Sequence, residues 1–288
     1  MTDLRTPPVS DGDLFSQRAR QYALEKPLQR IHILEAGCGW GTGLDLGGRE
    51  HHVTGVDADS PELRAHTCDR TDLDAWHLGD LRTVPLPPRA FDIVHASYLI
   101  ERVPHAELVL DRFVAALKPG GLLLVRLRDR NTAYGFLDRT LPAWMHVGNR
   151  RRRKLTRPGR GPRGAHARVP DAPGSGAPAS GASEPGRETE TVSTAENRRP
   201  VFRTIPPPAV YDRVASRSGM QWYCVMRGLV VAEEYTSRQA IKALGAGTGL
   251  AELLCRLVSV ITRGRLPADH SEVTLVIRKP ENRFARVI

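Results

Sequence analysis

The chain has 288 residues, a formal net charge of +10 and 40% hydrophobic residues, enough for one large domain or two small ones. Its cysteines, Cys38, Cys68, Cys224 and Cys255, lie far apart, which excludes a CxxC site and a secreted disulfide framework. The polar N-terminus lacks the apolar core of a secretory signal. The apolar stretch 250–261 is too short to span a bilayer. We therefore expect a soluble protein of the cytoplasm.

The first half of the chain alternates between strand-like and helix-like segments. Residues 1–30 are expected to form an N-terminal helical extension. Predicted strands are IHILEAG (31–37), HHVTGVDAD (51–59), FDIVHAS (91–97) and GGLLLVRLR (120–128). Predicted helices are Ser60–Thr67, with a serine cap and a proline in the first turn, and His105–Leu117, which KPGG ends. This alternation predicts an α/β fold, a mostly parallel sheet with helices on both faces.

A basic segment of different composition follows at residues 150–200. It is rich in Pro, Gly, Ala and Ser, and its twelve basic and five acidic residues give it a net charge of +7. Such a composition buries too little apolar surface to offset the entropy of ordering, so we predict a disordered insertion. The run RRRRK (150–154) also allows contact with nucleic acid or a membrane surface, although no aromatic residues are interleaved with it.

The strand and helix pattern resumes in residues 201–288. A helix with a glycine break is predicted over 208–228, a strand over 229–236, a glycine-interrupted helix over 239–262 and a last strand over 271–279. If residues 201–288 formed an independent domain, its two strands would provide only a small core. We therefore expect residues 201–288 to complete the sheet begun in 31–149.

The stretch ILEAGCGWGTG (33–43) places a glycine turn directly after a strand. Such a turn brings backbone N–H groups and a helix N-terminus close to a ligand. The dinucleotide fingerprint GxGxxG fails, because Thr42 or Leu44 stands where the third glycine is required. This argues against a nicotinamide-dependent oxidoreductase. The helix after the turn contains Gly47 and Gly48, so we expect it to be short.

Residues 33–125 resemble the class I S-adenosylmethionine-dependent methyltransferases. The likeness rests on an ordered set of motifs: an acid before GxGxG, an acid ending the second strand in VTGVDADSPEL, GDL after the third, FDIVHASYLIERV, and LKPGG. It implies a seven-strand Rossmann-like sheet and S-adenosylmethionine as the cofactor. The cofactor contacts that we expect are Glu35, Gly37, Cys38, Gly39, Gly41, Asp57, Ala58, Asp80, Leu81 and His95.

Three acids carry the expected binding of this cofactor. Carboxylates at the carboxyl ends of parallel strands lie where ligands bind in open α/β sheets. Asp57 suits the two ribose hydroxyls, Asp80 the adenine amino group with Leu81 offering its N–H to the ring, and Glu35 the methionine ammonium, directly or through the loop backbone. Asp92 is expected to be structural, and Trp40 either covers the ligand or packs outward.

No catalytic residue stands out on the acceptor side. Methyl transfer is an in-line displacement that depends mainly on alignment, and a base is needed only if the acceptor must lose a proton. The weak candidates for catalysis are His95, Tyr98 and His105. Residues Glu101, Arg126, Arg128, Asp129 and Tyr134 share the same loops, and for each a solvated or structural role is the ordinary alternative. No cluster has metal-ligand spacing.

The function predicted from these observations is methyl transfer to a small-molecule acceptor. Methylation of RNA or protein is an alternative that the basic insertion leaves open. A non-catalytic protein that keeps the cofactor pocket as a regulatory feature is an alternative of another class. The acceptor, the atom methylated and the oligomeric state are not defined by the sequence.

Overall fold

A computed structural model describes residues 13–39, 41, 43–140, 209–242 and 248–281. These residues belong to one compact unit, which residues 1–153 and 204–288 form. Trp40 and the predicted insertion 150–200 lie outside the described residues.

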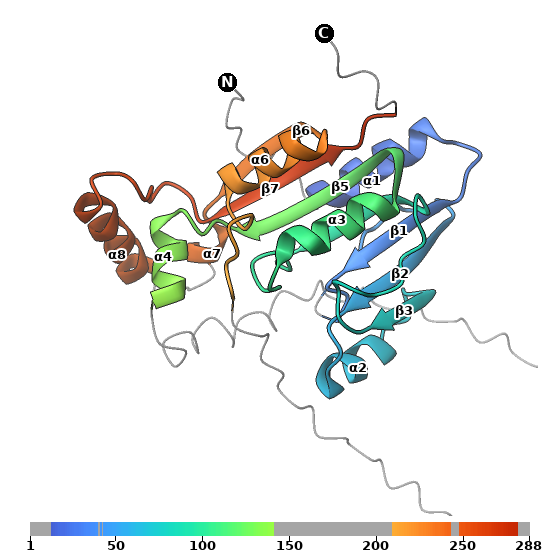
Figure 1. The fold of residues 1–288 in the computed structure, drawn as a ribbon, viewed down its shortest axis with the longest axis horizontal. Helices are drawn as coiled ribbons and strands as arrows, with labels where there is room; N and C mark the ends of the chain where they lie inside the picture. The colour runs from blue at the N-terminus through green and yellow to red at the C-terminus, as the bar shows by residue number, and fades with distance from the viewer. Residues whose placement is uncertain (1–12, 40, 42, 141–208, 243–247, 282–288) are drawn as a thin grey trace, which may run out of the picture. The chain divides into compact units, whose positions relative to one another are not determined.

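A seven-stranded sheet runs through this unit in the order β3-β2-β1-β4-β5-β7-β6 (Figure 1). The strands β1 to β5 are parallel, and β7 pairs antiparallel with both β5 and β6. Their bounds are β1 Ile31–Ala36, β2 His51–Asp57, β3 Ala75–Leu78, β4 Phe91–Ser97, β5 Leu117–Arg128, β6 Val230–Ser237 and β7 Glu272–Arg278. The predicted fold class is confirmed, and both late strands join the same sheet.

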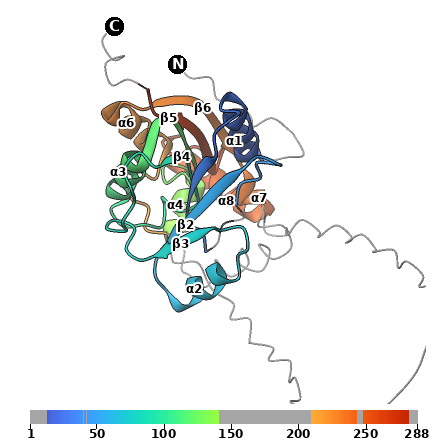
Figure 2. The same ribbon diagram turned by 90° about the vertical axis from the view of Figure 1, so that its right-hand side faces the viewer.

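Helices cover both faces of the sheet. The helices α3 (Ala106–Ala116) and α6 (Arg217–Arg227) pack on one face, and α1 (Leu14–Glu25) packs on the other. Figure 2 shows them on opposite sides of the strands. The remaining helices are α2 (Pro61–Cys68), α4 (Ala133–Thr140), α7 (Gln239–Lys242) and α8 (Thr248–Ile261).

The apolar runs of the sequence explain the central strands. In β1, Leu34 and Ala36 belong to the core under α3 and α6, whereas Ile31 and Ile33 belong to the core under α1. A strand that is buried on both faces needs apolar residues at nearly every position. This is why these strands can be recognised as short, mainly apolar segments.

The predicted start of α2 is confirmed. Ser60 accepts a hydrogen bond from the Leu63 N–H at 3.2 Å, and Pro61 is the first helical residue. A serine cap satisfies one of the free N–H groups at a helix start. The Ser60 side chain, and not Asp57, therefore caps this helix.

Two expected helices differ in the structure. Residues 43–50 contain no helix, because Gly47 has φ +66° and its N–H donates to the Asp45 carboxylate at 2.7 Å, which closes a turn. The helix expected over 208–228 begins only at Arg217, after Ser216, which caps it from an extended conformation. Tyr211, with φ +53°, breaks any earlier helix.

Candidate cofactor site

The glycine turn follows β1 at the carboxyl edge of the sheet. Gly37 has φ +84°, a conformation that favours glycine, and its N–H donates to the Val56 carbonyl of β2 at 2.8 Å. The Cys38 side chain is buried against Gly55, and burial raises the pKa of its thiol to about 12. The turn is therefore fixed to β2, and Cys38 supplies no reactive thiolate.

Asp57, at the end of β2, connects this strand to the glycine turn that follows β1. One carboxylate oxygen accepts the Gly39 N–H at 2.9 Å, and the other accepts the Ala58 N–H at 2.8 Å. The side chain is buried, and burial raises its pKa above the ordinary value, although the two N–H donors act in the opposite direction. Each oxygen can accept a further hydrogen bond.

Glu35, at the end of β1, is paired with a residue that the sequence did not reveal. Both of its carboxylate oxygens accept from the guanidinium of Arg70, at 2.8 and 2.7 Å. Arg70 also donates to the Cys38 carbonyl at 2.6 Å. Glu35 is thus joined to the turn backbone through Arg70, in the position where the resemblance places the methionine ammonium.

The glycines leave little room beside these carboxylates. A Cβ atom on Gly41 would lie 1.7 Å from the Glu35 carboxylate, and one on Gly39 would lie 2.5 Å from Leu63. Contacts below 3.0 Å force a shift of one of the groups. Glycine at positions 39 and 41 therefore lets the turn backbone pack directly against Leu63 and the Glu35 carboxylate, where no larger residue would fit.

Asp80 and Leu81 lie in the loop after β3. The Gly79 N–H donates to the Asp57 carbonyl at 2.9 Å, which holds this loop beside β2. The Asp80 carboxylate is exposed and pairs with Arg82, whose hydrogen bonds lower the Asp80 pKa to about 2. Leu81 is buried in the core under α3. Asp80 thus reaches the same edge as Asp57 but faces solvent.

His95 lies in β4, in register with Glu35 of β1. Its ring is buried, meets the Phe15 ring edge-on at 5.3 Å and contacts the Ser97 hydroxyl at 2.9 Å. Burial lowers its pKa to about 4, so the ring is neutral at neutral pH. The Nδ1 atom is buried without a hydrogen-bond partner among the described residues.

Most of the acceptor-side candidates lie close together: Arg128 interacts with Glu101 and Tyr134, and Glu272 of β7 interacts with Tyr98, Arg126 and Arg128. Tyr98 has φ +55° and its side chain bonds Glu272 of β7, whereas His105 is exposed at the start of α3. Arg126 contacts the Phe15 ring, Arg128 pairs with Asp138 at 3.2 Å, and Tyr134 packs in a small core with α7 and α8. These contacts give Tyr98, Arg126, Arg128 and Tyr134 a structural role, whereas His105 lies on the surface.

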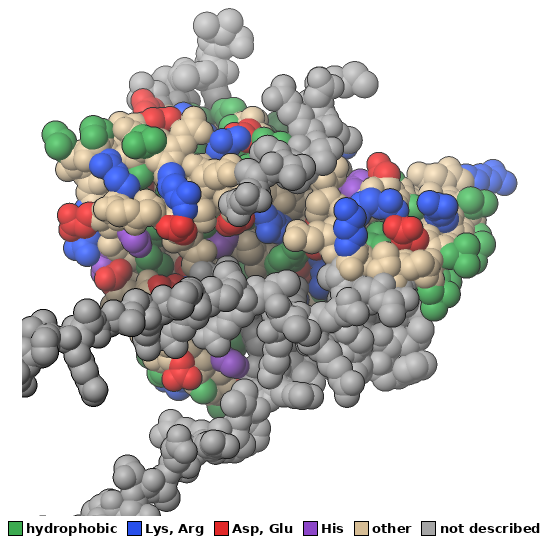
Figure 3. Space-filling model, turned by 180° about the vertical axis from the view of Figure 1, so that it is seen from behind, with side chains coloured by type: hydrophobic (Ala, Val, Ile, Leu, Met, Phe, Trp, Pro, Cys, Tyr) green, Lys and Arg blue, Asp and Glu red, His purple; other side chains and the backbone are tan. Residues whose placement is uncertain are grey.

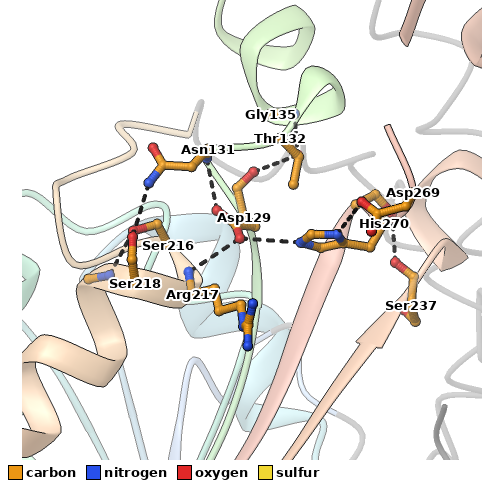
Figure 4. Close-up of polar contacts among 12 residues, drawn as sticks. Asp129, Asn131, Thr132, Gly135, Ser216, Arg217, Ser218, Ser237, Asp269 and His270 are labelled. Atoms are coloured by element: carbon orange, nitrogen blue, oxygen red, sulfur yellow. Dashed lines mark hydrogen bonds and ion pairs between the residues drawn. The ribbon is translucent and has the colours of Figure 1, made fainter. Parts of the chain in front are cut away.

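Asp129, directly after β5, holds three segments together (Figure 4). It accepts from the Asn131 N–H at 2.8 Å and the Arg217 N–H at 3.3 Å, and lies 3.5 Å from His270. His270 also contacts Asp269 at 2.7 Å. Burial disfavours the protonated ring, but the two carboxylates outweigh it and raise the His270 pKa. Asp129 therefore ties β5 to α6 and β7.

Asp92 has the structural role that we expected. Lys118 donates to it at 2.6 Å, the His32 N–H donates at 3.1 Å, and the side chain is buried. It joins the start of β4 to β1 and β5, away from the glycine turn.

Glu101 is completely buried, and neither carboxylate oxygen has a hydrogen-bond partner among the described residues. Burial raises its pKa from 4.5 to about 6. The folded protein therefore gains stability from this group below pH 4.5 and loses it as the pH rises through 6, by roughly 2 kcal/mol. We expect Glu101→Gln to remove this loss when urea unfolding is compared at pH 5 and pH 8.

The exposed Glu62→Gln is the control for this comparison, because Glu62 lies on the surface of α2. It should keep the pH dependence of the unmodified protein. If Glu101→Gln showed that same pH dependence, Glu101 would not be the titrating group.

The polar groups at this edge of the sheet suit an organic ligand. Among the described residues, no group of three or more His, Cys, Asp or Glu side chains is placed to hold a metal ion. The further acceptor capacity of Asp57, and the His95 Nδ1 that has no hydrogen-bond partner among the described residues, fit a polar organic ligand at the ends of β2 and β4.

Comparison with known proteins gives the family. A family model described as a methyltransferase domain matches residues 11–173. The chain belongs to the methyltransferase domain family. The expected membership of the class I S-adenosylmethionine-dependent methyltransferases is confirmed, and with it S-adenosylmethionine as the cofactor.

Methyltransferases of known activity align with part of the chain. The trans-aconitate 2-methyltransferase of Rhizobium rhizogenes is 30% identical over 43% of this chain and 49% of its own length. The one of Variovorax paradoxus is 28% identical over 41% and 46%. The mitochondrial ubiquinone biosynthesis O-methyltransferase of Mus musculus is 31% identical over 43% and 35%. The chain thus spans at most about half the length of these relatives.

Among solved structures, a SAM dependent methyltransferase from Archaeoglobus fulgidus is similar to this chain. It is 12% identical, with a TM-score of 0.46, and the alignment covers 92% of this chain and 93% of that one.

Proposed function

We propose that this methyltransferase-domain protein transfers the methyl group of S-adenosylmethionine to a small-molecule acceptor. The observation that carries the proposal is the convergence of Asp57 and the Glu35–Arg70 pair on one glycine turn. Relatives named for trans-aconitate and for ubiquinone biosynthesis support the small-molecule class. We also propose a cytoplasmic location, which the four free cysteines support.

Different residues of the chain bind different parts of the cofactor. Asp57 accepts hydrogen bonds from the two ribose hydroxyls, through the lone pairs that Gly39 and Ala58 leave free. Asp80 accepts from the adenine amino group after releasing Arg82, and the Leu81 N–H reaches the ring. Glu35 acts through Arg70, which positions the Cys38 carbonyl and the turn backbone. The neutral His95 ring lies at the same edge.

The reaction follows from alignment of the acceptor with the cofactor. When bound, S-adenosylmethionine supplies a methyl group that is attached to a sulfonium. The leaving group of the transfer is the neutral thioether of S-adenosylhomocysteine. The turn and Asp57 fix the position of that methyl group, and this removes much of the entropic barrier. An acceptor carboxylate needs no base, whereas a hydroxyl acceptor must lose its proton to water or a side chain.

The test is release of S-adenosylhomocysteine in the presence of candidate acceptors. We expect release with a small carboxylic acid or phenol from a panel that includes trans-aconitate. A transfer RNA mixture serves as the control and should give only background. Release with RNA alone would favour the nucleic-acid alternative, and cofactor binding without release on any acceptor would favour a regulatory protein.

A further inference from the structure

Among the described residues, helix α8 packs against the rest of the protein along one side. Ala251, Cys255 and Val258, at helical spacing, pack with Ala133 and Tyr134 of α4. Cys255 is the only residue of α8 that is buried. The opposite side of the helix is therefore free of contact with the described core.

That opposite side is apolar. The exposed fractions are 64% for Leu250, 64% for Leu253, 53% for Leu257, 75% for Val260 and 70% for Ile261. We call these five residues the α8 ridge. Their spacing places them on one stripe of the helix. Figure 3 shows hydrophobic side chains gathered at the edge of the molecule that α8 forms, with arginine or lysine side chains beside them.

The charge around the α8 ridge is basic. Arg256 is exposed and lies three residues after Leu253 and four before Val260, which places it along the ridge. Lys242, Arg263 and Arg265, at the ends of α7 and α8, are exposed as well. The one acid of the helix, Glu252, lies 3.5 Å from Arg238 and is neutralised by it. A leucine-rich stripe beside arginines is the pattern of a helix that lies in a membrane interface.

We infer that the α8 ridge and its flanking basic residues bind the surface of an anionic lipid membrane, with the helix lying in the plane of the interface. The arginine stems extend along the apolar boundary while their charged groups reach lipid phosphates. No helix of the described residues is long and apolar enough to cross a membrane, so the contact that we propose is peripheral.

The size of the α8 ridge argues against a second copy of the chain as its partner. A helix of 14 residues is about 21 Å long and 10–12 Å wide, so one face offers on the order of a few hundred Å². A stable protein interface buries roughly 800 Å² on each partner.

The test is sedimentation of the full chain with vesicles of phosphatidylcholine alone or mixed with phosphatidylglycerol. We expect binding to the mixed vesicles, weaker binding at high salt, and little binding to phosphatidylcholine alone. The double variant Leu253→Glu/Leu257→Glu should bind the mixed vesicles at least about tenfold more weakly than the unmodified protein. Circular dichroism should show that it is folded.

The matched control is Leu24→Glu, because Leu24 of α1 is also a leucine with a large exposed fraction, 71%. This control should bind vesicles as the unmodified protein does. Equal vesicle binding by the α8 variant would overturn the inference and assign lipid binding to another basic segment. A dimer in sedimentation equilibrium that the α8 variant abolishes would overturn it in favour of a second copy.

Discussion

Arg70→Ala is expected to destabilise the folded protein by about 3–5 kcal/mol, because it leaves the buried Glu35 carboxylate without its ion-pair partner. The exposed fractions of the two side chains are 12% and 2%, so the ion pair is largely shielded from solvent. Urea unfolding followed by circular dichroism measures the change in the free energy of unfolding. Adding Glu35→Gln to this variant should recover part of the loss.

The matched control for Arg70 is Arg64→Ala. Arg64 pairs with Asp59 at 2.8 Å, but about half of each side chain is exposed. Such surface pairs contribute roughly 0–1 kcal/mol, so this variant should unfold close to the unmodified protein. Equal unfolding midpoints for the Arg70 and Arg64 variants would show that Arg70 does not stabilise the turn.

Asp57→Ala is expected to weaken binding of S-adenosylhomocysteine by about 1–3 kcal/mol, which is roughly 5- to 150-fold in the dissociation constant. The variant removes the acceptor for the ribose hydroxyls and also frees the Gly39 and Ala58 N–H groups. Calorimetric titration measures the change. Asp59→Ala, which removes an exposed carboxylate two residues away, should bind like the unmodified protein.

The central parallel strands could be predicted because burial on both faces requires mainly apolar residues. Strands that are covered on both faces, such as β1 and β4, appear as short segments in which most residues are apolar. The short edge strand β3 has only one neighbour in the sheet and no fully buried residue. It left no apolar run to recognise, and only the family motif indicated that an acid follows it.

Residues 209–216 could not be predicted because a contact distant in sequence decides their conformation. Their composition suits a helix, but the Val210 and Tyr211 N–H groups both donate to the Glu101 carbonyl, at 2.8 and 2.9 Å. Tertiary hydrogen bonds of this kind override local helix preference. The helix therefore starts later than the sequence suggested.

The candidate site was only partly predictable, because some of its contacts join residues that are distant in sequence. Motif spacing indicated Glu35 and Asp57, because each acid directly ends a strand next to the turn. Arg70 carries no local signal: it is a single basic residue in a loop, 35 positions from the carboxylate that it pairs with. Burial of His95 and of Glu101 also depends on packing that no short motif encodes.

Calorimetric titration of the unmodified protein with S-adenosylhomocysteine and, separately, with NAD shows whether the glycine turn with Asp57 and the Glu35–Arg70 pair forms an adenosyl-amino-acid site. We expect saturable binding of one S-adenosylhomocysteine per chain and no measurable heat with NAD. Binding of NAD, or no binding of S-adenosylhomocysteine, would contradict this expectation.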